Sequence, residues 1–326
     1  MNNPLIAEVA ADVLGSASPE PADEALPALW STVVELDWPL VSIDEDSGGA
    51  GGTLDDLLTL ISAVAESGIS LPLAEAAVAR WALVDSGHDP AGLVVPASAD
   101  AEGALHDVPW ARHAQHLVVW REQSAPLLVD LAESRIERST NLAGEPRDTV
   151  VLPESGGVAL PQAPSRPEML ARAALLNAAG IVGAARGAHE ITRAHVTQRH
   201  QFGRPLIAVK SVASALATMR TDLVSAEAAL GRAREAHERD DAETLLAGTA
   251  TAKIRAARAA TSIARNAHQL HGAMGVTQEH SLHHVTRKLW AWRDEHGSER
   301  SWAIWLGREA RALGEDALWT DLTAGV

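Results

Sequence analysis

Apolar and polar residues in the first hundred positions repeat at helical spacing and are interrupted by turns. The segment LDDLLTLISAVAES, which starts at Leu54, places apolar side chains three and four residues apart, and Thr53 before it is a suitable N-cap. A second helix is predicted over residues 73–86. These patterns predict an N-terminal helical domain over residues 1–104.

The pattern changes to short apolar runs between residues 105 and 164. The runs HLVVW, APLLVDL, DTVVLP and GVALP are separated by charged residues or by Gly and Pro, which is typical of strands. Four or five such runs are too few for a full barrel. We therefore predict a small middle β region over residues 105–164.

From residue 165 onward the chain has the period of a helix almost throughout. Helical segments are predicted over residues 171–200, 206–239, 242–270, 279–293 and 299–313. Long antiparallel helices with short connections form four-helix bundles. This predicts a C-terminal helical bundle over residues 165–326, and a chain that is mostly α.

Composition narrows the class of protein. The chain has 46% hydrophobic and 21% charged residues, which is typical of a globular protein. It has no cysteine, which excludes disulfides, thiolate nucleophiles and Cys-ligated metals. The net charge of -16 argues against a nucleic-acid partner. Because no apolar run is long enough to span a bilayer and no signal peptide is evident, we expect a cytoplasmic protein and no membrane.

The first candidate loop is RHQFGRP, at the end of a predicted helix. Arg199 and Arg204 offer planar guanidinium groups that suit a phosphate or pyrophosphate, and Phe202 can stack on a base or ring. Gly203 permits a tight turn and Pro205 suits the start of the next helix. By themselves the same residues are also typical of an ordinary corner between two helices.

The second candidate loop is QLHGAMGVTQE, which starts at Gln269. Its glycines allow close backbone approach, Gln269 offers both a donor and an acceptor, and exposed backbone N–H groups can hold an anion. The alternative is a helix C-cap followed by Thr277 as the next N-cap. This loop is also weak evidence when it is considered alone.

The two loops together are specific. The segments RHQFGRPL and QLHGAMGVTQEHSLHHVTRKLW lie about 65 residues apart and flank two long helices. This arrangement resembles the C-terminal bundle of the acyl-CoA dehydrogenase family. VSIDEDSGGAGGTLDDLLTLISAVAESG resembles the first helical domain of the same family, so the resemblance covers nearly the whole chain. It implies the acyl-CoA dehydrogenase fold, with a truncated middle β region.

The resemblance also implies an activity. Members of the family remove hydrogens from the α and β carbons of an acyl-CoA thioester, with FAD as cofactor and an electron-transferring flavoprotein as the usual acceptor. The FAD lies across a subunit interface, and its nucleotide end is held by the bundle of the neighbouring subunit. Lys210 reaches the ribose or phosphate on this pattern, or else it is a plain surface lysine. The residues assigned to the nucleotide end are Arg199, Gln201, Phe202, Lys210, Gln269, Gly272 and Ala273.

The catalytic carboxylate of the family is missing from both of its usual places. The Glu-Gly-Thr/Ser step reads His296-Gly297-Ser298, and the position on the first bundle helix that a second branch uses is Ala174. Glu295 is one residue away, and a one-residue step points a side chain elsewhere. His296 is a potential base near neutral pH, but burial would lower its pKa and keep it neutral. We therefore predict no catalytic residue in this chain.

The middle region also departs from the family. It has about half the residues that the family spends on the β-barrel around the flavin ring, and the Thr-Glu-Pro-x-x-Gly-Ser type loop is absent. With these two departures the chain resembles the smaller subunits of actinobacterial α2β2 acyl-CoA dehydrogenases, which act on CoA thioesters of steroid side chains. This implies a heterotetramer with a complete catalytic partner that supplies the base and the ring site. The bulky steroid acyl group is an inference by analogy.

Two further predictions concern a metal site at histidines and a subunit interface at tryptophans. His280 and His284 have the i,i+4 spacing of metal ligands on a helix. No third ligand is evident and the family uses no metal, so no metal site is predicted. The pairs Trp290 with Trp292 and Trp302 with Trp305 are assigned to a subunit interface.

Two other functions stay open at this point. The first is a self-sufficient homodimeric dehydrogenase with His296 as its base. The second is a non-enzymatic scaffold that keeps the bundle and binds no nucleotide.

Overall fold

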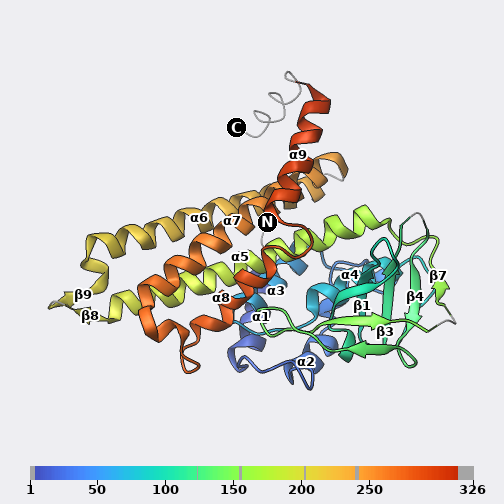
Figure 1. Ribbon diagram of the computed structural model, residues 1–326, viewed down its shortest axis with the longest axis horizontal. Helices are drawn as coiled ribbons and strands as arrows, with labels where there is room; N and C mark the ends of the chain where they lie inside the picture. Colours follow the sequence, from blue (N-terminus) through green and yellow to red (C-terminus); the bar gives the residue numbers. More distant parts are fainter. Residues whose placement is uncertain (1–3, 123, 154–155, 202, 239–241, 315–326) are drawn as a thin grey trace.

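The computed structural model describes residues 4–122, 124–153, 156–201, 203–238 and 242–314 (Figure 1). The N-terminal part contains four helices: α1 (Pro4–Gly15), α2 (Leu29–Glu35), α3 (Leu54–Glu66) and α4 (Leu73–Leu83). Thr53 caps α3 as predicted, because its hydroxyl accepts from Asp56 N and the Asp56 carboxylate accepts from Thr53 N. α4 ends at Leu83, three residues before the predicted end.

The C-terminal part is helical, as predicted. Its helices are α5 (Arg166–Gln198), α6 (Lys210–Glu238), α7 (Ala242–His271), α8 (Leu282–Trp292) and α9 (Glu299–Leu313). Figure 1 shows α5, α6 and α7 as long neighbouring helices, with α9 projecting from one end of the bundle. Pro205 precedes a short 3-10 turn (Leu206–Ala208), so α6 starts at Lys210, later than the sequence predicted.

The strands of the β region form two small sheets. β1 (Val94–Ser98), β3 (His116–Trp120), β4 (Leu127–Asp130) and β7 (Val158–Ala159) make the first, in the order β1-β3-β4-β7. β2 (Leu105–Pro109), β6 (Arg147–Val151) and β5 (Arg135–Glu137) make the second, in the order β2-β6-β5. The four runs predicted as strands correspond to β3, β4, β6 and β7. β1 lies within the segment assigned to the N-terminal domain, so strands begin earlier than residue 105.

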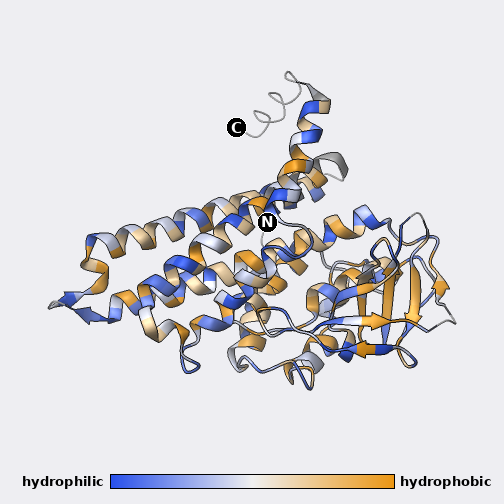
Figure 2. Ribbon diagram, viewed as in Figure 1, coloured by the Kyte–Doolittle hydropathy of each residue, from blue (hydrophilic) through white to orange (hydrophobic). Residues whose placement is uncertain are grey.

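Helix α5 is the central element of the fold. It is long and apolar enough to cross a membrane by length and composition, but 78% of its most apolar window is buried inside the fold. Glycine allows α3 to pack closely against it, because a Cβ at Gly183 would lie 2.0 Å from the Ser62 carbonyl oxygen. Figure 2 shows apolar residues concentrated on the strands and alternating with polar ones along the bundle helices. α5 is therefore the core helix of this fold.

Candidate functional site

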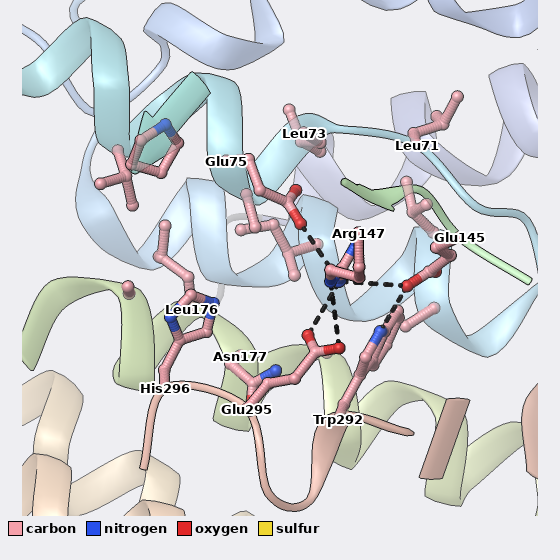
Figure 3. Close-up of a pocket in the computed structure, with 18 of the residues that line it drawn as sticks. Leu71, Leu73, Glu75, Glu145, Arg147, Leu176, Asn177, Trp292, Glu295 and His296 are labelled. Atoms are coloured by element: carbon pink, nitrogen blue, oxygen red, sulfur yellow. Dashed lines mark hydrogen bonds and ion pairs between the residues drawn. The ribbon is translucent and has the colours of Figure 1, made fainter. Parts of the chain in front are cut away.

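A closed cavity lies between α3, α4, α5 and the turn that follows α8 (Figure 3). Most of its wall is apolar, with side chains such as Ile61, Leu73 and Leu176. It leaves about 50 Å³ for water-sized molecules. The polar residues in its wall are Glu75, Glu145, Arg147, Asn177, Glu295 and His296.

Arg147 is the central charge of this cavity. It is the first residue of β6, is 7% exposed, and donates from Nε and Nη2 to the Glu295 carboxylate at 3.1 and 2.8 Å. The same guanidinium lies 3.4 Å from Glu145 and 3.7 Å from Glu75. Figure 3 shows these carboxylates pointing toward the guanidinium from three sides. A two-point pair with a buried arginine has a fixed geometry, so Glu295 is held in one position in the cavity wall.

Glu145 joins the network to α8. Its carboxylate accepts from Lys288 Nζ at 3.0 Å, Trp292 Nε1 at 2.7 Å and Asn141 Nδ2 at 3.0 Å. Burial alone would raise the pKa of Glu145, but Lys288 and Arg147 outweigh it and lower that pKa to about 2. Glu145 is therefore ionised. Trp292, which the sequence assigned to a subunit interface, instead packs inside this chain and lines the cavity.

The pKa of Glu75 is shifted in the opposite direction from that of Glu145. It lies in the first turn of α4, and its burial raises its pKa to about 7 despite the attraction of Arg147. A carboxyl group that is half protonated near neutral pH is unusual and often marks a functional site. Here the perturbation has a structural source, because Glu75 is the third carboxylate around a single guanidinium.

The sequence resemblance places the family's catalytic carboxylate at His296 or at Ala174, and of these two residues only His296 lines the cavity. His296 lies in its wall, and Ala174 is fully buried on α5 next to Ala173, which also lines it. Burial lowers the pKa of His296 to about 4, as the sequence predicted in direction. The backbone of His296 has φ 53°, in the left-handed region, and its carbonyl accepts from Trp302 Nε1 at 3.0 Å. The histidine is therefore neutral and held by a fixed turn.

Lys253 stabilises the chain before that turn through hydrogen bonds to the end of α8. Its ammonium is fully buried on α7 and donates to the carbonyl oxygens of Trp292 and Arg293 at 2.8 and 3.3 Å, and to the side chain of Asn177. The two carbonyls belong to the last turn of α8, where a cation is favourable. Lys253 therefore fixes the end of α8 relative to α5.

The first group of predicted cofactor residues lies at the far end of α5. Arg199 is the C-cap of α5, Gln201 belongs to the two-residue strand β8 (His200–Gln201), and Lys210 is the first residue of α6. All three are exposed. Phe202 lies outside the described residues.

The second group lies at the same end of the bundle. Gln269 is in the last turn of α7, and Gly272 and Ala273 form the 3-10 turn (Gly272–Val276) that follows; all three are exposed. Gly272 has φ +60°, and a Cβ there would meet nothing within 4 Å. The rings of His195 and His271 stack with centroids 4.3 Å apart, which brings the end of α5 against the end of α7. The two loops are thus neighbours in space.

Comparison with known proteins agrees with this architecture. Residues 167–299 match the acyl-CoA dehydrogenase, C-terminal domain, family. The C-terminal part of this chain, residues 167–299, therefore has the C-terminal domain of the acyl-CoA dehydrogenase family. It is 27% identical over 270 residues to the acyl-CoA dehydrogenase IpdE2 of Mycobacterium tuberculosis, covering 78% of each chain. It is 30% identical over 268 residues to acyl-CoA dehydrogenase FadE34 of the same organism, covering 76% of this chain and 37% of that protein.

Solved structures share the fold. A variant of the Tcur3481-Tcur3483 steroid ACAD superposes with a TM-score of 0.80 at 21% identity, covering 94% of this chain and 96% of that chain. The ChsE4-ChsE5 complex from Mycobacterium tuberculosis gives a TM-score of 0.80 at 17% identity, covering 96% of each chain. These similarities confirm the mostly helical fold with small middle sheets.

Sequence reasoning missed most of the charged network. Glu75, Glu145 and Arg147 come from α4 and from the start of β6, which are distant in sequence. No signal in the sequence pointed to them, because Glu145 and Arg147 lie in the turn before the run DTVVLP that was predicted as a strand. Their partners Glu295 and Lys288 become evident only in the folded chain.

Proposed function

We propose that this chain is a non-catalytic subunit of an FAD-dependent acyl-CoA dehydrogenase. The observation that carries this proposal is the cavity at the missing catalytic positions. It leaves about 50 Å³, whereas pockets for small molecules measure roughly 300–1,000 Å³. Arg147 and its three carboxylates occupy the wall where an acyl thioester would need apolar space. This cavity is therefore too small to hold the acyl group of a CoA thioester.

The absence of a strong base supports the same proposal. A general base works best when its pKa lies near the operating pH. His296 has its pKa lowered to about 4, and Ala174 has no titratable group. Glu75 is buried in the ion-pair network and lies 3.7 Å from Arg147, so proton transfer by Glu75 would have to disturb that network. A homodimeric dehydrogenase with His296 as base is thus less well supported.

The residues of the two predicted cofactor loops, around Arg199 and Gln269, suit the nucleotide end of FAD. Arg199 is exposed and offers a planar fork for a pyrophosphate, Gln201 and Gln269 offer amide groups, and Gly272 leaves its surroundings open. The donor chemistry fits an anionic dinucleotide. Residues Arg199, Gln201, Phe202, Lys210, Gln269, Gly272 and Ala273 would hold it, and FAD when bound supplies the acceptor for the hydride from the β-carbon.

The distance between the two sites supports a reactive ring that is held by another chain. α5 rises about 1.5 Å per residue, so Arg199 lies about 33 Å along the helix from Asn177 in the cavity. This is longer than one extended FAD molecule. A cofactor held at the corner therefore presents its ring to a partner chain, which we propose to be a complete acyl-CoA dehydrogenase subunit in a heterotetramer.

The substrate class and acceptor follow from the relatives. The names of similar proteins include a steroid ACAD and a two-component complex, ChsE4-ChsE5. On this analogy we propose that the assembly dehydrogenates a bulky acyl-CoA, such as a steroid side-chain CoA thioester. We propose that it works in the cytoplasm and passes its electrons to an electron-transferring flavoprotein.

The test is co-purification with a full-length acyl-CoA dehydrogenase from a neighbouring gene. We expect the chain alone to carry little flavin and no turnover, and the complex to be yellow and active. In the complex, Arg199→Ala should lower flavin content, whereas Arg121→Ala, an exposed arginine of the β region, should not. His296→Ala should leave turnover of the complex unchanged.

Each alternative has its own signature in these experiments. Stable yellow colour and turnover from the single chain, abolished by His296→Ala, would establish the homodimeric enzyme. Full flavin content in the Arg199→Ala complex would favour a scaffold that does not contact the cofactor.

A further inference from the structure

Three imidazoles lie close together at the end of the bundle that carries the two predicted cofactor loops. His195 comes from the last turn of α5, His271 ends α7, and His280 lies in the connection to α8. One ring nitrogen of each lies within 4.8 Å of a ring nitrogen of the other two. His271 stacks on His195 at 4.3 Å and meets His280 edge-on at 4.8 Å between centroids. The three residues come from three separate elements, so the cluster is a product of the fold.

His271 is prepared for coordination. It is 6% exposed, and its Nδ1 lies 2.8 Å from the Ala267 carbonyl oxygen. A carbonyl only accepts, so Nδ1 carries the proton and Nε2 presents a lone pair. That buried Nε2 has no hydrogen-bond partner within the described part of the chain. A backbone carbonyl that fixes the other nitrogen is the usual support of a metal-bound histidine, and an unpartnered buried acceptor is costly without a ligand.

The charge state of the cluster also suits a metal. Burial, followed by the neighbouring charges of His280 and Arg199, lowers the pKa of His195. Burial lowers the pKa of His271 to about 4, and its hydrogen bond to Ala267 only partly offsets this. Both rings are therefore neutral near pH 7, and metal ligands must be deprotonated. An all-imidazole site suits Zn²⁺, Cu²⁺ or Ni²⁺ rather than Mg²⁺ or Ca²⁺.

We propose that His195, His271 and His280 together bind one divalent transition-metal ion of the Zn²⁺ class. A tetrahedral ion with Zn–N bonds of about 2.0–2.1 Å needs ligand nitrogens roughly 3.3 Å apart, whereas the structure has them within 4.8 Å of one another. Because an imidazole binds a metal in the plane of its ring, His195 must also rotate out of its stack on His271. His195 and His280 are only partly buried and have room to turn toward the fixed His271. The fourth position stays open to water or to an anion.

His280 is the weakest of the three ligands. Its Nδ1 accepts from Leu282 N at 3.1 Å, so the neutral ring carries its proton on Nε2. Coordination through Nε2 moves that proton to Nδ1 and breaks the hydrogen bond from Leu282. Removal of His280 should therefore weaken binding less than removal of His271.

The ion would connect the two predicted cofactor loops. Arg199 follows His195 by one helical turn, and Gln269 precedes His271 by two residues. A metal that joins His195 to His271 thus fixes the spacing between the corner of α5 and the end of α7. A third ligand for His280 was not evident from the sequence, because His195 and His271 reach it only through the packing of α5 against α7. His280 also precedes the first residue of α8, so its helical spacing to His284 does not apply.

The experiment uses the full chain, stripped with a chelator and titrated with Co²⁺, whose visible d–d bands report tetrahedral nitrogen coordination. We expect one Co²⁺ per chain, displaced by Zn²⁺. His271→Ala should weaken binding by at least the roughly 10–100-fold that loss of a supporting second-shell partner costs. His280→Ala should weaken it by less. His284→Ala is the matched control, since it removes a partly buried histidine outside the cluster.

Thermal melting by circular dichroism shows whether each variant is folded. If His271→Ala does not fold, His195→Ala and His280→Ala decide the question. Absence of d–d bands from the folded chain overturns the proposal. So does Co²⁺ binding that persists in folded His271→Ala, or that is lost equally in His284→Ala, because the ion would then lie on surface histidines.

Discussion

Glu295 and Arg147 form a two-point ion pair, with Nε and Nη2 of the guanidinium 3.1 and 2.8 Å from the two carboxylate oxygens. Glu295 immediately precedes His296, so this pair orients the turn that carries His296. Glu145 and Glu75 approach the same guanidinium at 3.4 and 3.7 Å. One positive charge therefore neutralises part of a group of three carboxylates in the cavity wall.

Removal of Arg147 should strongly destabilise the chain. Arg147→Ala leaves Glu295 without its cation, whereas Glu145 keeps Lys288, and breaking a buried pair in this way costs about 3–5 kcal/mol. Urea unfolding of the two proteins measures this loss. The control is Arg135→Ala, which removes an exposed partner of Glu137 and should cost less than about 1 kcal/mol. Similar small losses in both variants would show that the network contributes little.

Gly183 should be essential for the contact between α3 and α5. A Cβ at this position would lie 2.0 Å from the Ser62 carbonyl oxygen, and backbone cannot move aside as a side chain can. Gly183→Ala should therefore lower the free energy of unfolding by about 1–3 kcal/mol or more. The control is Gly231→Ala on α6, where a Cβ meets nothing within 4 Å.

The free energy of unfolding of the control variant should change in the opposite direction. Gly231→Ala places a better helix former in α6 and should raise stability by about 0.5–1 kcal/mol. Denaturant midpoints of the two variants therefore shift to opposite sides of the parent protein. A Gly183→Ala protein at least as stable as the parent would mean that the two helices separate without cost.

The stability of the chain should fall between pH 6.5 and pH 4. Burial lowers the pKa of His271 and of His296 to about 4, whereas the unfolded chain titrates at 6.5. In this window the unfolded state binds more protons, so stability falls as the pH falls. Glu145, with its pKa lowered to about 2, adds a further loss as the pH falls below 4.5.

Glu75 should oppose this acid loss. Its pKa is raised to about 7, so the folded chain binds more protons than the unfolded chain between pH 7 and pH 4.5, and this group gains stability as the pH falls. Thermal melting across pH 4–7 measures the balance. His296→Asn should flatten the profile and Glu75→Gln should steepen it; a profile unchanged by both substitutions would contradict the assignment of these groups.

The long elements were predictable because local pattern decides them. Thr53 and Asp56 specify the start of α3 within four residues, and the helical period of the bundle persists for about 30 residues at a time. β1 was missed because its run, Val94–Ser98, follows a turn that looked like the end of a helical domain. It is stabilised by parallel pairing with β3, and parallel partners are distant in sequence.

The candidate site was predictable only in part. The loops around Arg199 and Gln269 were identified from sequence, and the contact of His195 with His271 brings them together. The assignment of His296 and Ala174 to the positions of a lost catalytic carboxylate stays a prediction from the resemblance. The charged residues of the cavity could not be predicted from the sequence. Arg147, Glu75 and Lys288 come from β6, α4 and α8, and they meet only where the β region packs against the bundle.

Lys253 should make the chain more stable as the pH rises above neutral. Its ammonium is fully buried between Asn177 and the last carbonyls of α8, and burial lowers its pKa to about 7, whereas the unfolded chain titrates at 10.5. Between these values the unfolded state binds the additional proton, so stability rises with pH. Lys253→Met keeps the aliphatic stem, removes this titration and leaves two helix-end carbonyls without their donor. Urea unfolding at pH 7 and pH 9 should show a gain for the parent protein and a smaller one for the variant. An equal gain in both proteins would mean that another group is responsible, and that Lys253 stays protonated among its three carbonyl acceptors.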